Sequence, residues 1–285
     1  TKKLLFNGCS YVAGDGLVWD DFRHDLEWED ILGKSPEKKN KLTQDQFRTI
    51  YNEYRSNFRP KFNLSAQCSN ILKREVVDLS SDGNSNDSIS LATINYLQRM
   101  PKNERQKFHV CIGWSTIDRK LYFSDKKNDF YNVLYNSPIN DDNIALMYQK
   151  FAILDNSVKN HAINYLTNLM LLENYLRNEK ISFTFWRSLD LPGRRTEERE
   201  AYQRIYLQSS AWHVSIPIYS ISKKENWLKF DDDDHPWLSD GWISTFDENS
   251  LIEHRNGYIN GHPNLEMVKK LAVKISAHIR AKHAL

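Results

Sequence analysis

Short apolar runs alternate with longer amphipathic segments along most of this sequence. The apolar runs have the length of β-strands and lie at about residues 3–7, 76–79, 108–113, 181–186 and 213–219. The segments between them carry apolar side chains at helical spacing, at residues 64–74, 88–99 and 161–177. This alternation predicts an α/β fold, in which a parallel five-stranded sheet has helices packed on both faces.

The last segment of the chain predicts a helix with one apolar face. Between Leu265 and Arg280, the positions on this face are Leu265, Val268, Leu271, Ala272, Ile275 and Ile279. Asn264 directly precedes them, and Asn is a favoured N-cap residue. We therefore expect the helix to begin after Asn264 and to dock on the sheet as its closing element.

Two stretches interrupt the alternation. Residues 19–60 are charged and aromatic, and residues 122–142 are rich in Asn, Asp, Lys and Tyr. Both follow predicted strands, and loops at the carboxyl ends of parallel strands are where α/β proteins build their sites. We interpret them as insertions that shape a substrate cleft within a single domain spanning residues 1–285.

Composition limits the classes of partner. The 285 residues are 40% hydrophobic, and 39 Lys and Arg against 37 Asp and Glu give a formal net charge of +2. Proteins that bind the phosphate backbone usually have a larger basic excess, so we expect no nucleic-acid partner. No apolar run approaches the length of a membrane span, and the start carries too few apolar residues for a signal peptide. We expect a soluble, cytoplasmic or particle-associated protein, and nothing in the sequence predicts its oligomeric state.

The first predicted strand leads into a tight turn at Asn7-Gly8-Cys9-Ser10. A hydroxyl at the carboxyl end of a buried strand projects above the sheet, where backbone N–H groups can face an oxyanion. This position suits a nucleophile for acyl transfer, although a serine beside glycine is also a common turn former or helix cap. Cys9 points to the opposite side, and with Cys68 and Cys111 it is expected to be a buried free thiol.

Four segments of the chain carry the residue types that such chemistry needs. They are Gly8-Cys9-Ser10-Tyr11, Gly83-Asn84-Ser85-Asn86-Asp87-Ser88-Ile89, Gly113-Trp114-Ser115-Thr116 and Asn260-Gly261-His262-Pro263-Asn264. In this order they resemble the sequence blocks of the SGNH (GDSL-type) hydrolase family, over nearly the whole chain. The resemblance implies a flavodoxin-like three-layer α/β/α sandwich. It also implies an esterase, lipase, thioesterase or carbohydrate deacetylase that uses no cofactor.

The resemblance assigns a role to three of these residues. It implies that Ser10 is the nucleophile, that His262 is the general base, and that Gly83 donates its backbone N–H to the oxyanion. A hydroxyl is a weak nucleophile until a base accepts its proton, and each preset oxyanion donor contributes about 3–4 kcal/mol. We expect glycine at position 83 because it lets the backbone approach with no side chain in the way.

The third segment departs from the family pattern. Where the family has an asparagine for the oxyanion hole, this chain has Ser115, whose hydroxyl could still donate. Asn86, or else Asn84, is an alternative amide donor, and both also suit ordinary turn chemistry. Trp114 and Arg119 are candidate substrate-binding residues, Arg119 for an anionic group, although a surface salt bridge is the commoner role of such an arginine.

The fourth segment lacks the acid that orients the histidine in the family. The family has an Asp two or three residues before the His, and here those positions hold Asn260 and Ile259. In serine proteases, changing the orienting Asp to Asn costs about 10⁴ in rate. Either another group orients His262, such as a backbone carbonyl, Asn260 or a distant carboxylate, or the enzyme is weak.

A second acid–base pair is possible in the acidic run at residues 231–236. Asp232 lies three residues before His235, which reproduces the spacing of the family. An amphipathic helix follows His262 and not His235, so His262 is the first choice. The acidic run also fits a solvated loop or a loose Ca²⁺ site, and no Cys/His spacing indicates zinc. We expect no metal at the site.

Together these features favour a serine ester hydrolase that acts through an acyl-Ser10 intermediate. The polar and aromatic composition of the two insertions favours a carbohydrate O-acetyl ester, or another small ester, as the substrate. The alternative is a weak or inactive protein of the same fold that binds a glycan, which the departures at Ser115 and Asn260 favour.

Overall fold

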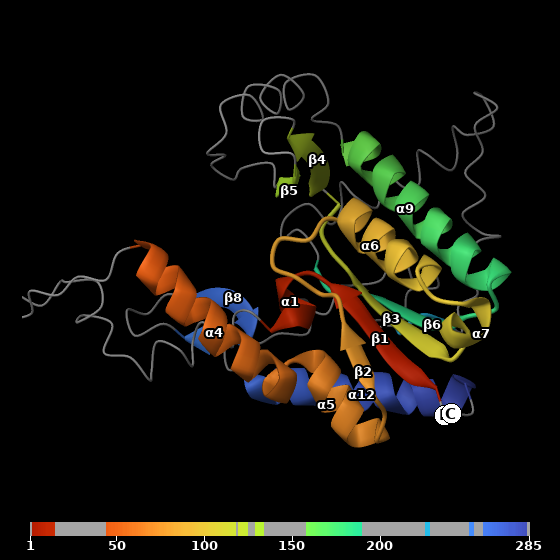
Figure 1. The fold of residues 1–285 in the computed structure, drawn as a ribbon, viewed down its shortest axis with the longest axis horizontal. Coiled ribbons are helices and arrows are strands. Elements are labelled where there is room, and N and C mark those ends of the chain that lie inside the picture. Colours follow the sequence, from red (N-terminus) through yellow and green to blue (C-terminus); the bar gives the residue numbers. More distant parts are fainter. Residues whose placement is uncertain are drawn as a thin grey trace, which may run out of the picture.

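The computed structural model describes residues 2–14, 44–117, 119–124, 129–133, 158–189, 226–228, 251–253 and 259–283. Along the chain, at least one helix separates each of the strands β1, β2, β3 and β6 from the next of these four (Figure 1). The elements are β1 (Lys3–Gly8), α1 (Ser10–Ala13), α4 (Gln44–Phe62), α5 (Leu64–Leu72), β2 (Val76–Asp78), α6 (Asn86–Gln98), α7 (Lys102–Arg105), β3 (Phe108–Trp114), β4 (Lys120–Ser124), β5 (Asp129–Val133), α9 (Val158–Asn178), β6 (Ser182–Arg187), β7 (Leu251–Glu253), β8 (Ile259–Pro263) and α12 (Leu265–His283).

Among the described residues, four parallel strands form the central sheet, in the order β2-β1-β3-β6. Because they run in the same direction, their carboxyl ends lie along one edge, and Gly8 of β1 pairs there with Gly113 of β3. Beyond β6, Trp227 forms an isolated parallel bridge with Phe185. The strand expected at residues 213–219 lies outside the described residues.

Helices cover both faces of the sheet, as the alternation predicts. α6 and α9 lie on one face, and α5 and α12 lie on the other (Figure 1). Along β1, Leu5 belongs to the apolar cluster under α6 and α9, whereas Leu4 and Phe6 belong to the cluster with α5 and α12. The expected three-layer α/β/α sandwich is confirmed.

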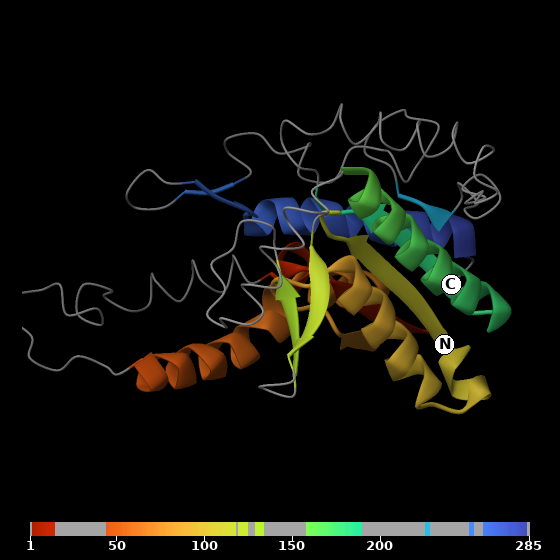
Figure 2. The ribbon, with the colours of Figure 1, turned by 90° about the horizontal axis from the view of Figure 1, so that it is seen from above.

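Regular structure occupies parts of the two stretches expected to be insertions. The end of the first forms α4, which packs on α5 and extends away from the sheet (Figure 2). In α4, Tyr54, Phe58 and Phe62 lie four residues apart and their rings stack in succession. The second contains β4 and β5, which pair as an antiparallel hairpin. The charged residues between the aromatic positions obscured the helical period of α4 in the sequence.

The segment before the last helix is a strand, β8, which pairs antiparallel with β7. α12 begins at Leu265, and Asn264 Oδ1 accepts a hydrogen bond from Met267 N at 3.0 Å. This N-cap confirms the expected start of the helix. Within the described segments, no helix combines the length and the apolar character that crossing a membrane requires.

Candidate active site

A tight turn between β1 and α1 places Ser10 at the carboxyl edge of the sheet. Ser10 is the first residue of α1 and is 2% exposed. α1 lies close to the sheet because two glycines face Val12. A Cβ on Gly8 would lie 2.4 Å from Val12 Cγ2, and a Cβ on Gly113 would lie 2.6 Å from the same atom. Because neither of these paired positions carries a side chain, α1 packs closely on the sheet and Ser10 lies at the ends of β1 and β3.

His262 reaches Ser10 from the other end of the chain. Its Nε2 lies 3.0 Å from Ser10 Oγ, so the expected proximity of the two side chains is found. β8 carries the histidine, and α12 begins directly after the capping residue Asn264. An imidazole nitrogen at this distance is placed to accept the proton of the hydroxyl.

Tyr11 is part of the site, although the sequence did not single it out. Its ring stacks on the imidazole of His262, with ring centroids 4.8 Å apart and an interplanar angle of 27°. Tyr11 is 7% exposed, and burial raises the pKa of its hydroxyl. The stack restricts rotation of the imidazole. The sequence shows only that an aromatic residue follows Ser10. Its role could not be predicted, because the partner ring, His262, lies at the other end of the chain.

The loop after β2 is fastened to the end of β1. Gly8 O accepts hydrogen bonds from Ser81 N at 3.2 Å and from Asn84 Nδ2 at 3.0 Å. Gly83 lies between these donors with φ 73°, and a Cβ there would meet nothing within 4 Å. This corrects the expected reason for glycine, which is its left-handed backbone rather than a lack of space. Within the described part of the chain, the N–H groups of Gly83 and Ser10 donate to no other residue.

The asparagines expected as oxyanion donors hold the loops of the site together. Asn86 is buried, its Nδ2 donates to Thr116 O at 3.0 Å, and its Oδ1 accepts from Ser115 N at 2.9 Å. Asn84 donates to Gly8 O, as described above, and accepts from Ser88 Oγ at 3.3 Å. The structure therefore corrects the assignment of Asn86, whose amide positions the loop after β3.

Ser115 lies beside the residue that precedes the nucleophile. Its hydroxyl is buried, forms no hydrogen bond to an oxygen or nitrogen of the described residues, and lowers the pKa of the Cys9 thiol. Burial has the larger and opposite effect, so the pKa of Cys9 is raised overall. A thiol kept neutral in this way is a poor nucleophile. Ser115 remains a candidate side-chain donor to an oxyanion.

Trp114 is a core residue and not a cleft residue. It is 0% exposed, and its ring lies edge-on to Phe185 at 5.4 Å and to Tyr165 at 5.8 Å between centroids. As the last residue of β3, it belongs to the apolar cluster under α6 and α9. Its expected role in substrate binding is therefore corrected, because a substrate cannot reach it.

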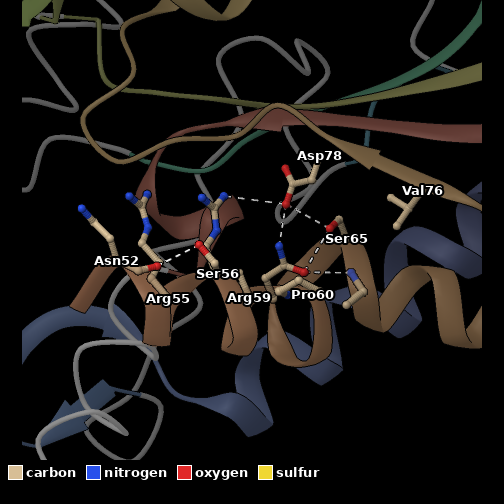
Figure 3. A pocket seen from close by; sticks show the side chains of 10 residues that line it. Asn52, Arg55, Ser56, Arg59, Pro60, Ser65, Val76 and Asp78 are labelled. Atoms are coloured by element: carbon tan, nitrogen blue, oxygen red, sulfur yellow. Dashed lines mark hydrogen bonds and ion pairs between the residues drawn. The ribbon is translucent and has the colours of Figure 1, made fainter. Parts of the chain in front are cut away.

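A cavity of about 540 Å³ lies between α4, α5 and β2, and Asp78 stands in its wall. Asp78 Oδ1 accepts from Ser80 N at 2.9 Å, and Asp78 Oδ2 accepts from Ser65 Oγ at 3.0 Å. Figure 3 shows Ser65 and Arg59 turned toward this carboxylate. Arg59 Nη2 lies 3.8 Å from Asp78 Oδ2. These polar groups of the wall hydrogen-bond one another and hold the loop that follows β2.

Arg59 connects α1 to the loop that follows β2. Its Nε donates to Ala13 O, at the end of α1, at 3.0 Å. Its Nη2 donates to Ser80 O at 2.6 Å. One guanidinium thus ties the helix that begins with Ser10 to the loop that carries Gly83.

Three of the expected site residues are not placed by the structure. Asp232 and His235, the rival acid–base pair, lie outside the described residues, as does the side chain of Asn260 in β8. In the segments that the structure describes, no three His, Cys, Asp or Glu side chains gather in a way that could hold a metal ion.

No family model matches the sequence, and no curated protein matches it. In structure, the chain is similar to a lipolytic protein assigned to the G-D-S-L family from Desulfitobacterium hafniense DCB-2, with 10% identity, a TM-score of 0.41, and 98% of this chain and 99% of that chain covered. It is also similar to a family two carbohydrate esterase from Clostridium thermocellum in complex with cellohexaose, with 12% identity, a TM-score of 0.42, and 99% and 65% covered. A third similar structure is an acetyl xylan esterase, Est2A, from the rumen bacterium Butyrivibrio proteoclasticus, with 9% identity, a TM-score of 0.45, and 100% and 64% covered.

Proposed function

We propose that this protein is a serine esterase with Ser10 as nucleophile and His262 as general base. The observation that carries the proposal is the distance of 3.0 Å between Ser10 Oγ and His262 Nε2. In the first step, Ser10 Oγ forms a bond to the ester carbonyl carbon while its proton passes to Nε2. The bond from that carbon to the alcohol oxygen then breaks, and the proton on Nε2 passes to the departing alcohol. Water then loses a proton to the same nitrogen and bonds to the acyl carbon, the bond from that carbon to Ser10 Oγ breaks to release the acid, and the proton on Nε2 returns to Oγ.

The developing oxyanion needs donors that are already in place. The N–H groups of Ser10 and Gly83 are supported in this role because neither donates to another described residue. Each loop that carries them is fixed to its neighbour, through the bonds that Gly8 O accepts and through Arg59. Preset donors of this kind stabilise the transition state without reorganisation.

The imidazole also needs an orienting group. In a triad, a carboxylate performs this task, and the sequence has Asn260 where the family has the acid. The stack of Tyr11 on His262 helps to fix the plane of the ring.

The preferred substrate is a carbohydrate O-acetyl ester. Its support is the polar and aromatic composition of residues 19–60 and 122–142, which follow β1 and β3 at the edge that carries Ser10. Aromatic rings suit sugar faces, and polar side chains suit hydroxyl groups. An acetyl group demands little space beside the nucleophile.

The test is hydrolysis of p-nitrophenyl acetate and of acetylated xylan by wild type, Ser10→Ala and His262→Ala. Cys9→Ala is the matched control, since it removes the adjacent thiol that the structure keeps neutral. We expect turnover by wild type and Cys9→Ala and its loss in the other two variants. A fluorophosphonate probe should label Ser10, and a peptide map should show the adduct there. Unchanged turnover by Ser10→Ala would refute the proposal.

A glycan-binding protein without turnover is the second candidate. The observation that favours it is Asn260 in place of the family's acid. If wild type hydrolyses no ester but binds an acetylated oligosaccharide in calorimetry, this second function replaces the first.

A further inference from the structure

Arg119 lies in the short connection between β3 and β4, at the edge of the sheet that carries Ser10. Ile117 is 2% exposed, and Leu121 N donates to Asp87 Oδ2 at 3.2 Å. These two anchors hold the backbone on both sides of Arg119. The backbone at Arg119 is therefore held in place by the fold of the site.

Arg119 is half-buried, and two of its guanidinium nitrogens are buried with no hydrogen-bond partner among the described residues. Its Nε and Nη1 are inaccessible to solvent and donate no hydrogen bond, and it makes no ion pair with the residues that the structure describes. The carboxylate of Asp87 accepts a hydrogen bond from the backbone of β4 and is already bonded to other residues. Its Oδ1 accepts from Asn164 Nδ2 at 3.1 Å and from Asn168 Nδ2 at 2.6 Å, and its Oδ2 accepts from Leu121 N.

The charge of Arg119 reaches both residues that flank the nucleophile. It lowers the pKa of the Cys9 thiol and of the Tyr11 hydroxyl, although burial is the larger effect and raises both. β1 and β3 are adjacent, and Gly8 pairs with Gly113, so the loops that follow these strands start side by side. The positive charge of Arg119 therefore acts on the residues on both sides of Ser10.

A buried guanidinium without a hydrogen-bond partner is costly, and an anion that pairs with it recovers that cost in charge-assisted bonds. Arg59, by contrast, donates hydrogen bonds to two backbone carbonyls. We propose that Arg119 binds an anionic group of the substrate, so that the site selects esters with a carboxylate close to the scissile bond. This inference rests on the proposed esterase function and narrows its substrate class. The carboxylate can belong to the acyl part or to the sugar part of the ester.

Two pairs of substrates separate these sources. Mono-p-nitrophenyl succinate and p-nitrophenyl butyrate differ by a carboxylate on the acyl part. Acetylated methyl glucuronide and acetylated methyl glucoside differ by a carboxylate on the sugar. The variants are Arg119→Gln, which removes the charge, and Arg119→Lys, which keeps it without the planar fork. The control is Arg99→Gln, an exposed arginine at the C-terminal end of α6.

We expect wild type to favour the anionic member of at least one pair. In that pair, Arg119→Gln should lower kcat/KM for the anionic ester about 10- to 100-fold more than for the neutral ester, mainly through KM. Arg119→Lys should lie between wild type and Arg119→Gln, and Arg99→Gln should leave the ratio as in wild type. Two results would overturn the inference. One is a wild type without charge preference in either pair, and the other is an equal loss on both members, which would place Arg119 at the oxyanion or in the fold.

A binding measurement separates this inference from the proposed function. In the Ser10→Ala protein, succinate or glucuronate should raise the melting temperature, and glucose should not. Adding Arg119→Gln should abolish the shift. This test measures binding and does not need hydrolysis, so it remains valid if the protein proves not to be an esterase. A shift in melting temperature that survives Arg119→Gln would overturn the role of Arg119 alone. Circular dichroism of each variant shows whether the fold is retained.

Discussion

Ser10 and His262 meet at one point, but the parts of the molecule that hold them differ. Ser10 follows β1, an inner strand of the central sheet, and several hydrogen bonds hold the residues around it. Asn7 Nδ2 donates to Ile89 O and to Thr93 Oγ1, both at 3.0 Å, and Asn7 Oδ1 accepts from Gly8 N at 2.8 Å. We call β1, α1 and the loop of residues 79–84 the nucleophile side.

The base side consists of β8, with His262, and the start of α12. Among the described residues, β8 pairs with β7 alone, and neither strand joins the central sheet. His262 is half-buried, and it contacts the hydroxyl of Ser10 and the ring of Tyr11, among others. The cap at Asn264 attaches this strand to the start of α12.

The difference indicates which substitutions would move Ser10 or His262 out of position. On the nucleophile side, many buried hydrogen bonds share the task of positioning, so the loss of one is partly compensated. On the base side, the described part of β8 pairs outside the central sheet, so the strands of that sheet do not hold His262 directly. Substitutions on the base side should therefore affect turnover more than stability, and those on the nucleophile side should affect both.

The largest expected effect comes from removing the two reacting groups together. Ser10→Ala and His262→Ala should each lower kcat about 10³-fold, and the double variant should lose no more than the single variants, because the two groups act as a unit. Steady-state kinetics on p-nitrophenyl acetate measures this. Losses that multiply in the double variant would mean that the two sides work independently.

Glycine substitutions test the packing of the nucleophile side. An added Cβ at Gly113 would lie 2.4 Å from Ser188 Oγ and 2.6 Å from Val12 Cγ2, so Gly113→Ala should lower the free energy of unfolding by about 1–3 kcal/mol. It should also displace α1 and lower kcat. Urea denaturation measures the first effect.

Gly83→Ala is the matched comparison, because its Cβ would meet no atom within 4 Å and only the positive φ opposes it. We expect a cost of about 1–2 kcal/mol from the backbone. A larger loss at Gly83 than at Gly113 would contradict the importance of close packing between α1 and the sheet.

Substitutions at Tyr11 sharpen the description of the base side. Tyr11→Phe keeps the ring that stacks on His262, whereas Tyr11→Leu removes it. An aromatic stack contributes about 0.5–1.5 kcal/mol, so Tyr11→Leu should lower kcat about three- to tenfold relative to Tyr11→Phe. Equal kcat values for the two variants would show that the stack does not orient the imidazole.

The smallest effect concerns the thiols. Burial raises the pKa of Cys9 and Cys111, and it raises the pKa of Cys68 to about 12. At pH 8 the three thiols are therefore neutral in the folded protein, and thiolate forms only as the pH approaches these raised values. Iodoacetamide at pH 8 should label them in guanidinium and leave them unlabelled in buffer, as mass spectrometry would show. Rapid labelling of Cys9 in the folded protein would mean that the nucleophile side opens.

Most of the sheet and its helices could be predicted from the sequence. The expected strand at residues 108–113 is β3, Phe108–Trp114, and the expected helix at residues 88–99 is α6, Asn86–Gln98. Both have apolar patterns that record which face is buried. α4 and β8 were missed, because the first carries charges between its aromatic residues and the second is short and holds Gly and Pro.

The candidate site could be predicted in part. The motifs pointed to Ser10 and His262, whose side chains meet, and to Gly83, whose loop lies against β1. Asn86 and Trp114 were assigned wrongly, since a motif records residue type and spacing but not the direction of a side chain. Asn86 turns to the loop after β3, and Trp114 turns into the core.

By itself, the sequence determined the order of strands and helices, the faces they bury, and the residue types available for acyl transfer, because periodicity and composition are local properties of the chain. Only the tertiary structure decided that Tyr11 stacks on His262, that Arg59 joins α1 to the loop after β2, and that two nitrogens of Arg119 are buried without a hydrogen-bond partner among the described residues. These relations join residues that are far apart in the chain or depend on which donors and acceptors remain unpaired after folding. Both are consequences of packing, which no local pattern contains.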